Sequence, residues 1–273
     1  MTVPTTDDGH RDGRSLHERI AADLRDRIMT GDLAPGVKLP STARLKEQFA
    51  ASNATIQKAL QLLKDERLVV GRAGSAVTVR EHRQQTVRPA ASTAPRSDGE
   101  PYPWLPEGHA GRAWRSRLLT VGEVVPPADV AAALRLAAGD TAIHRSQVLT
   151  VDGEPVELVH TYYPPEVARG TALAQRQRVK GGSPALLAEL GLRIVRCVDL
   201  VTARVPTQEQ YEALRLPGDL PVLRTLRVAY AASAAGERPV EATVMTKAGH
   251  LYELRYEFHP DLASPAGGPA PSD

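Results

Sequence analysis

Hydrophobic residues near the start of the chain recur at every fourth position, which is the spacing of one face of an α-helix. The stripe consists of Leu16, Ile20, Leu24 and Ile28. Ser15 and Glu18 match a capping box, in which the serine hydroxyl and the glutamate carboxylate each accept from a backbone N–H of the first turn. Gly31 suits a helix C-terminus. The pattern predicts a helix that begins after Ser15 and ends at Gly31.

Two shorter helices and a hairpin are predicted next. One helix follows Ser41, and another is capped by Ser52 or Asn53. Their apolar positions can bury the stripe of the preceding helix, and these are Leu45, Phe49, Ala50, Ile56, Ala59, Leu60 and Leu63. The β-branched runs 68–70 and 77–79 then flank the glycine-containing stretch 71–76, which fits a hairpin. Three helices and a hairpin are typical of a winged helix-turn-helix.

The third predicted helix has polar residues that its core does not need. Asn53 and Gln57 stand one turn apart, and Gln57, Gln61 and Lys64 share one row. Amide side chains can donate and accept together at an adenine edge, so this face suits base recognition. An ordinary solvated helix face would have the same composition, and periodicity does not separate the two interpretations.

Basic residues are concentrated in the same region. The net charge of the chain is only +2, but between residues 38 and 64 a single acidic residue, Glu47, opposes a set of basic ones. The set consists of Lys38, Arg44, Lys46, Lys58 and Lys64. A local excess of this kind suits the phosphate backbone of a nucleic acid, although a solvated surface gives the same count.

Low-complexity stretches divide the 273 residues into two candidate domains. We expect a disordered N-terminus at 1–14, a DNA-binding domain at 15–82, a linker at 83–103, a larger domain at 104–261 and a disordered tail at 262–273. The N-terminus lacks an apolar segment of the signal-peptide kind, and no apolar stretch approaches the length of a membrane span. These features predict a cytoplasmic protein without membrane contact. The single cysteine, Cys197, is expected to be a structural thiol.

The larger domain alternates strand-like runs with helix signals, which predicts an α+β fold. Strands are expected at 142–149 and 156–163, joined at Asp152-Gly153, and at 193–205 and 222–229. Helices are expected after Pro127, Pro184 and Thr207. Ser183 and Pro184 fit the N-cap and first position of a helix, whose free N–H groups can attract an anion, although the spacing by itself favours an ordinary loop-to-helix cap. No metal-ligand spacing, nucleophile motif or carboxylate pair stands out, so no cofactor, metal site or catalytic residue is expected.

The head resembles the DNA-binding domain of GntR-family bacterial regulators. The resemblance rests on the run Asp32-Leu33-Ala34-Pro35-Gly36-Val37-Lys38-Leu39-Pro40-Ser41 and on the later positions Leu45, Phe49, Ser52, Thr55, Ala59-Leu60 and Leu63. It implies DNA contacts from Ser41, Thr42, Arg44, Ser52, Asn53, Thr55, Gln57, Lys58, Arg72 and Ser75. Family members usually have arginine at the places of Asn53 and Gln57, so a different operator is expected here.

The body resembles the UTRA effector-sensing domain of the HutC-type branch of that family. The landmarks are Val124-Val125-Pro126-Pro127, Gly139-Asp140, Asp152-Gly153-Glu154-Pro155-Val156, Tyr162-Tyr163-Pro164, Leu190-Gly191, Ala203-Arg204-Val205-Pro206-Thr207 and Pro221-Val222-Leu223. The resemblance implies a chorismate-lyase-like antiparallel sheet with peripheral helices, which senses a ligand and dimerises. The effector contacts expected from it and from the neighbouring strands are Arg145, Gln147, His160, Ser183 and Glu241.

Sugar-phosphate-sensing relatives use two arginines and a glutamate where this chain has Gln147, Leu149 and Val159, so a phosphosugar effector is not expected. The resulting hypothesis is a homodimeric repressor that binds an inverted-repeat operator in double-stranded DNA and responds to a small molecule. Two alternatives stay open. One is a plasmid-type repressor with a ligand-free dimerisation domain, and the other is a lyase-type enzyme.

Overall fold

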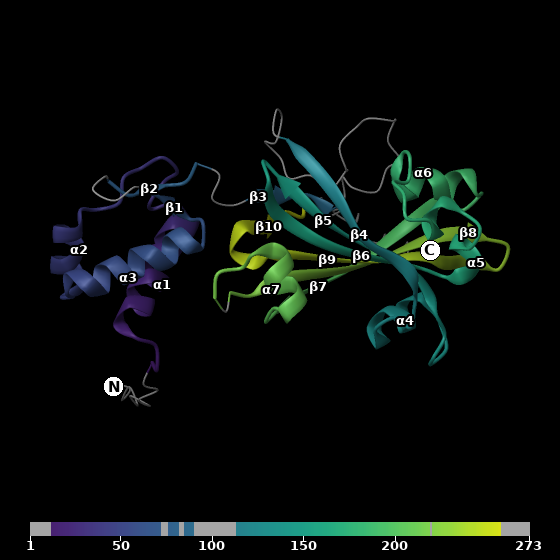
Figure 1. Ribbon diagram of the computed structural model, residues 1–273, viewed down its shortest axis with the longest axis horizontal. Helices are drawn as coiled ribbons and strands as arrows, with labels where there is room; N and C mark the ends of the chain where they lie inside the picture. The colour runs from purple at the N-terminus through teal and green to yellow at the C-terminus, as the bar shows by residue number, and fades with distance from the viewer. Residues whose placement is uncertain (1–11, 72–75, 82–84, 90–112, 219, 258–273) are drawn as a thin grey trace, which may run out of the picture.

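The computed structural model describes residues 12–71, 76–81, 85–89, 113–218 and 220–257, which form an N-terminal head and a larger body (Figure 1). The expectations for the first residues and the tail, for Arg72 and Ser75, and for most of the segment 83–103 lie outside these ranges. None of the helices within the described ranges is long and apolar enough to span a bilayer.

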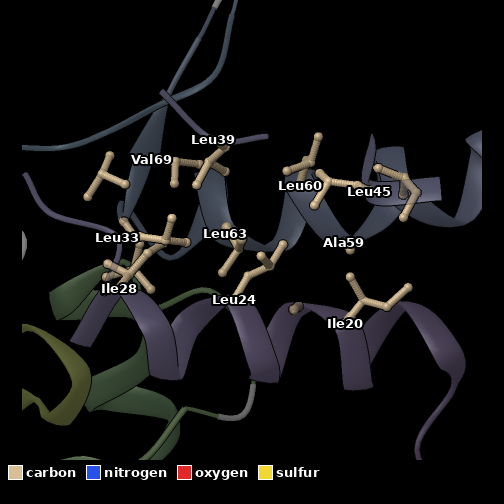
Figure 2. Packing of buried hydrophobic residues seen from close by; sticks show 14 of the residues in the cluster. Ile20, Leu24, Ile28, Leu33, Leu39, Leu45, Ala59, Leu60, Leu63 and Val69 are labelled. Carbon is tan, nitrogen blue, oxygen red and sulfur yellow. The ribbon is translucent and has the colours of Figure 1, made fainter. Parts of the chain in front are cut away.

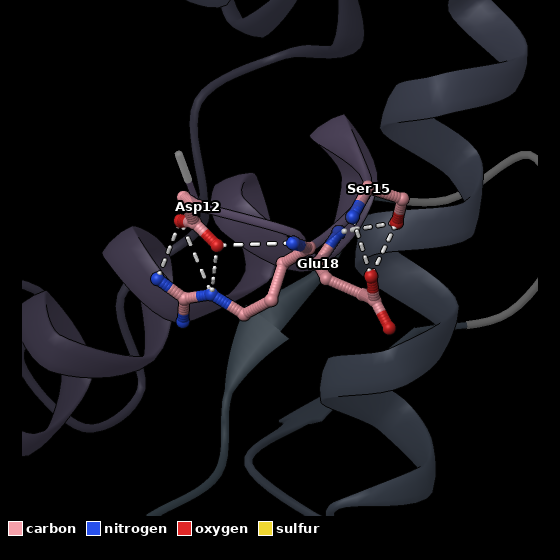
Figure 3. Close-up of polar contacts among 4 residues, drawn as sticks. Asp12, Ser15 and Glu18 are labelled. Atoms are coloured by element: carbon pink, nitrogen blue, oxygen red, sulfur yellow. Dashed lines mark hydrogen bonds and ion pairs between the residues drawn. The ribbon is translucent and has the colours of Figure 1, made fainter. Parts of the chain in front are cut away.

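The head begins with the three predicted helices, α1 (Leu16–Thr30), α2 (Thr42–Phe49) and α3 (Asn53–Asp65). The capping box of α1 is confirmed, because the Ser15 hydroxyl accepts from the Glu18 backbone and the Ser15 N–H donates to the Glu18 carboxylate at 2.6 Å (Figure 3). Gly31 ends α1 at a φ of 96°, a left-handed conformation in which a Cβ would be strained. Both ends of the helix were therefore encoded locally.

The core of the head lies between α1 and α3. Ile20, Leu24 and Ile28 are each at most 1% exposed, and they face Ala59 and Leu63 of α3 (Figure 2). A two-stranded wing, β1 (Val69–Val70) paired antiparallel with β2 (Thr78–Val79), closes one end of this core. The predicted winged helix-turn-helix is confirmed.

The body is built on one antiparallel six-stranded sheet in the order β4-β5-β6-β9-β8-β7. Its strands are β4 (Trp114–Val124), β5 (Ala142–Val151), β6 (Glu154–Tyr163), β7 (Ile194–Arg204), β8 (Val222–Ser233) and β9 (Gly236–Ala248). The 152–153 turn joins β5 to β6 as predicted, whereas β4 and β9 were not predicted. The α+β expectation is confirmed.

Helices cover both faces of this sheet (Figure 1). One face, called here the α4 face, carries α4 (Ala128–Leu134) and α7 (Gln208–Leu214), whose apolar residues pack on Tyr162 and Leu158. The opposite α6 face carries α5 (Pro165–Ala168), the 3₁₀ turn η2 (Ala172–Ala174) and α6 (Gly182–Glu189). Ile143 and Tyr163 belong to the α6 face. Neighbouring residues of a strand therefore serve different layers.

The segment that leaves the head also forms a strand. Residues Gln85–Val87 form β3, which pairs in parallel with β10 (Tyr252–Leu254) after the short 3₁₀ turn η3 (Gly249–Leu251). Residues 85–87 of the predicted linker thus form ordered structure, because their backbone groups have partners on a strand far away in the sequence. The periodicity of residues 83–103 gave no sign of this pairing.

Candidate DNA interface and effector site

The polar residues of α3 lie on its outer side. Ser52, Asn53, Gln57 and Lys58 are exposed, while Ile56 and Leu63 on the other side are fully buried. The amide nitrogen of Gln57 lies 3.5 Å from the hydroxyl oxygen of Thr42, the first residue of α2. The beginnings of α2 and α3 therefore form one continuous outer surface.

Serine side chains cap both of these helices. The Ser41 hydroxyl accepts from the Arg44 N–H at 3.3 Å, and the Ser52 hydroxyl accepts from the Thr55 N–H at 3.1 Å. A helix N-terminus carries partial positive charge and attracts phosphate. Exposed Arg44 and Lys58 add full charges beside it. Of the predicted DNA contacts that the structure describes, Thr42 and Thr55 are partly buried and the others are exposed. The surface combines phosphate-binding groups with amides.

A second polar site lies on the α6 face around Glu241. Its carboxylate is 8% exposed; Oε1 accepts from the Thr243 hydroxyl at 3.2 Å, whereas Oε2 has no hydrogen-bond partner among the described residues. The neighbouring Tyr163 is buried, and burial together with the Glu241 charge raises its pKa well above the usual value. A hydrogen bond from Ser183 acts in the opposite direction on this pKa. The structure thus brings Ser183 and Glu241 together around one buried phenol.

The start of α6 differs from the prediction. Gly181 occupies the N-cap position with a φ of 70° and no side chain caps the helix, so Ser183 is the second residue of α6 rather than its cap. Ser183 was predicted as the N-cap because a serine followed by proline is common at the start of a helix. Here Gly181 and Gly182, both with positive φ, form the turn that leads into α6. The Gly182 N–H donates to the Val179 carbonyl oxygen at 3.2 Å and Pro184 has no N–H, so among the first three residues of α6 the Ser183 N–H is the one that a ligand could accept.

Arg145 lies on the α6 face, and its guanidinium group is hydrogen-bonded to backbone carbonyl oxygens. Its guanidinium donates to the carbonyl oxygens of Leu173 and Gln175 at 2.8 Å and of Gln177 at 2.7 Å. Arg145 therefore holds the loop that precedes α6, and its role as an effector contact stays a prediction. Gln147 accepts from the Ser116 hydroxyl at 2.9 Å on the same face.

His160 lies on the α4 face, opposite to Glu241, so the structure does not bring these two predicted effector contacts together. A regular two-residue hairpin would pair Arg145 with His160, but a bulge between Leu149 and Thr150 shifts the register, so that Arg145 pairs with Thr161. A shift of the strand register by one residue places each side chain of the shifted strand on the opposite face of the sheet. The ring of His160 stacks on His144, with 3.1 Å between Nε2 of His144 and Nδ1 of His160.

Sequence reasoning missed Arg227, which lies on β8 next to the site. Its guanidinium forms two hydrogen bonds of 2.7 Å to the Asp199 carboxylate, and its Nη2 donates to the Pro89 carbonyl at 3.2 Å. An arginine inside the apolar run 222–229 was the available signal, because buried arginines are nearly always paired. Arg227 connects the α6 face to the segment that follows β3.

Comparison with known proteins decides the family. Residues 109–253 match the UTRA domain, and residues 16–79 match the family described as bacterial regulatory proteins, gntR family. The chain belongs to the GntR family. In this GntR-family protein the gntR match covers the helices and wing of the head, and the UTRA match covers the sheet of the body.

Relatives in two bacteria match along nearly the whole chain. HTH-type transcriptional regulator SCO4628 of Streptomyces coelicolor is 29% identical over 92% of this chain and 94% of its own length. HTH-type transcriptional regulator RB1450 of Rhizobium meliloti is 30% identical over 90% of this chain and 96% of its own length. The solved structure of PhnF from Mycobacterium smegmatis has a TM-score of 0.52 at 21% identity, and the match covers 88% of this chain and 99% of that one. This structural likeness supports the fold.

The combination of domains fixes the general function. This GntR-family protein is a DNA-binding transcriptional regulator whose activity a small molecule modulates through its UTRA domain. The head carries the exposed polar surface of α2 and α3, and the body carries the buried cluster around Glu241.

Proposed function

We propose that this GntR-family regulator is a repressor that binds an inverted-repeat operator as a homodimer, with α3 of each protomer in a major groove. The observation that carries the proposal is the exposed row of Asn53 and Gln57 on α3, next to the capped N-termini of α2 and α3. The amides would read base edges, while Ser41, Arg44, Ser52 and Lys58 would hold phosphates. Thr42 and Thr55 are partly buried and would lie at the edge of this DNA-binding surface.

Variants of α3 test base recognition. Gln57→Ala should weaken binding to the selected operator about tenfold and leave non-specific binding unchanged, because a bidentate amide contact contributes roughly 1 to 3 kcal/mol of discrimination. Gln61→Ala is the matched control, since Gln61 lies one turn further along and donates to Asp65 at 2.8 Å. Fluorescence anisotropy on operator and scrambled duplexes measures both affinities. An equal loss on both duplexes would contradict base readout.

The exposed edge of the sheet supports dimerisation. Strand β7 lies at this edge, and its apolar residues Val195 and Leu200 are 53% and 56% exposed, with Val205 beyond its end at 78%. Unpaired edge strands with exposed apolar residues commonly pair with a second copy. Leu200→Lys should convert the dimer to a monomer in analytical ultracentrifugation, whereas the charged control Thr202→Lys on the same strand should have a smaller effect. A wild-type monomer would exclude this arrangement.

We infer further that the effector binds between Ser183 and Glu241. The unpartnered Oε2 of Glu241 suits a hydroxyl or ammonium donor, and the uncapped start of α6 suits an anionic group. A ligand carrying both groups would bridge them. This assignment keeps Ser183 and Glu241 as proposed contacts, with Gln147 at the margin of the same face.

Ligand screening by thermal shift tests this site. Metabolites that carry both groups should include one that raises the unfolding temperature of the full chain and releases operator DNA. Glu241→Gln should abolish the shift, while Glu189→Gln, an exposed change at the end of α6, should leave it unchanged. If none of the metabolites stabilises the protein, the body acts as a ligand-free dimerisation unit. If mass spectrometry recovers the stabilising ligand chemically altered, the body is an enzyme.

A further inference from the structure

A second hollow lies where the head meets the body, away from the Glu241 site. Its volume is about 450 Å³, which falls in the range of small-molecule sites. Val79 and Val70 form part of its wall on the head, and Leu214, Leu216 and Val156 form part of its wall on the body. None of Ser183, Glu241, Gln147 and Arg145 lines it. The hollow, called here the junction cavity, is thus separate from the proposed effector site.

Two arginines of the head, Arg67 and Arg80, line this cavity and lie near the carboxylate of Glu154. Nη1 of Arg67 lies 3.8 Å from Oε2 of Glu154, and Nη1 of Arg80 lies 3.7 Å from the same oxygen. Both separations exceed hydrogen-bond length, and the Glu154 side chain is 47% exposed. The half-exposed Glu154 carboxylate therefore faces two guanidinium groups without a hydrogen bond to either, while Nη2 of Arg67 donates to the carbonyl oxygen of Arg215 at 3.5 Å. A second carboxylate placed between them would gain charge-assisted hydrogen bonds.

The other acidic residues of the cavity leave its lining with more arginines than unpaired carboxylates. Glu66 is already paired with Arg25, whose Nε donates to Oε2 at 2.7 Å. Glu81 is the remaining acid in the lining, and Arg215 is a third arginine there. Since Arg25 neutralises Glu66, the lining keeps three arginines against Glu154 and Glu81. The cavity favours an anion.

His250 also lines the cavity, and its side chain is uncharged. Its Nε2 lies 2.9 Å from the Glu66 carbonyl oxygen, to which it donates, and this contact links the body to the head. Burial lowers the pKa of His250, so the ring is neutral near pH 7. The polar groups of the cavity are therefore concentrated around Arg67 and Arg80, and much of the remaining wall is aliphatic.

We propose that the junction cavity binds a small amphipathic carboxylate. The carboxylate bridges Arg67 and Arg80 in place of Glu154, and the apolar part of the ligand packs on Leu214, Leu216 and Val156. Because such a ligand contacts head and body together, it stabilises their observed arrangement by its own binding free energy. This gives the regulator a second chemical input, distinct from the effector site.

Calorimetric titration of the full chain tests the proposal with a defined probe, 4-phenylbutyrate, and its uncharged counterpart 4-phenylbutan-1-ol. The acid should bind saturably, and the alcohol should bind at least tenfold more weakly. Arg80→Gln should weaken the acid about tenfold, the effect of losing one charge-assisted contact. Glu154→Gln should strengthen it severalfold, because the competing carboxylate is gone. Arg193→Gln, an exposed change between α6 and β7 that does not line the cavity, is the matched control and should have no effect.

The opposite results would overturn the site. Absence of saturable binding, equal affinity for acid and alcohol, or an unchanged affinity in Arg80→Gln would each exclude it. If Glu241→Gln rather than Arg80→Gln abolishes binding, the acid occupies the effector site, and the junction proposal fails while the proposed function stands. Circular dichroism of each variant verifies that it is folded.

Discussion

The Nη2 atom of Arg227 donates to the carbonyl oxygen of Pro89 at 3.2 Å. This bond joins the central sheet of the body to the segment that follows the head. Arg227 is also paired with Asp199, and the charge of nearby Glu241 acts on the same guanidinium. The pKa of Arg227 is raised, with burial opposing and the Asp199 carboxylate favouring the charged form. A change of charge beside Glu241 would therefore act on the guanidinium group that donates to the Pro89 carbonyl oxygen.

Breaking this pair should destabilise the body. Arg227→Met leaves the Asp199 carboxylate without its partner in a site where both side chains are at most 13% exposed. Loss of one partner of a buried pair costs about 3 kcal/mol or more. The double variant Arg227→Met with Asp199→Leu should recover much of the loss, because no charge is left buried. Urea unfolding followed by near-UV circular dichroism measures the unfolding free energies of the native protein, of both single variants and of the double variant; additive losses in the double variant would show that the pair does not act as a unit.

Lys58 should contribute to operator affinity through phosphate alone. Lys58→Gln is expected to weaken operator and scrambled duplexes by the same factor. The slope of log K against log salt concentration should become shallower by about 0.9, because one fewer counterion is released. Anisotropy titrations at four salt concentrations give the slope. Arg193→Gln serves as the charge-matched control, and a loss confined to the operator would assign Lys58 to base readout instead.

The stacked pair His144 and His160 should make the body sensitive to acid. Burial, with a smaller effect of the His160 charge, lowers the pKa of His144 from 6.5 to about 4. Burial also lowers the pKa of His160, while Glu209, 3.7 Å away, acts in the opposite direction. Between pH 6.5 and about 4 the unfolded chain binds a proton that the folded chain does not, so stability falls as the pH is lowered.

Replacing His144 should reduce this dependence. His144→Phe keeps a ring against Tyr162, with which His144 stacks at 4.7 Å, but removes the titrating group. The decrease in unfolding temperature between pH 7 and pH 4.5 should be smaller in the variant than in the native protein. Differential scanning calorimetry at both values measures it. An identical decrease in both proteins would assign the acid sensitivity to other groups.

The capping box at Ser15 should contribute measurably to the stability of the head. Ser15→Ala removes the acceptor for the Glu18 N–H and should cost about 1 kcal/mol. Ser15→Asp retains an acceptor at the cap and should restore most of the loss. Hydrogen exchange of α1 amides in the full chain reports the head separately from the body. Equal protection in all three proteins would show that packing on α3 alone holds α1.

The head could be predicted from sequence because its signals are local. The four-residue spacing of Ile20, Leu24 and Ile28, with a cap at each end of α1, specifies the helix without reference to the rest of the chain. The outward direction of Gln57 follows from the same periodicity. Where a residue lies on a helix is fixed once the buried stripe is known.

The body could be predicted only in part, because its determinants are not local. Strand β9 is buried on both faces and contains Glu241 and Lys247, so it shows no alternation of apolar and polar residues. Lys247 is tolerated there because it pairs with Glu157, which is 90 residues away. The face of His160 depends on a bulge at Val156 of β6 that no residue pattern marks. Register and ion pairs between distant strands require the folded chain.

The pairing of β3 with β10 has a consequence for biosynthesis. Residues 85–87 leave the ribosome long before residues 252–254, so the segment that connects the head has no parallel partner while most of the body is being made. The head, whose contacts are local, can fold and meet DNA during that interval. The strand pair that attaches the head to the body therefore forms only after nearly all of the sheet has been synthesised.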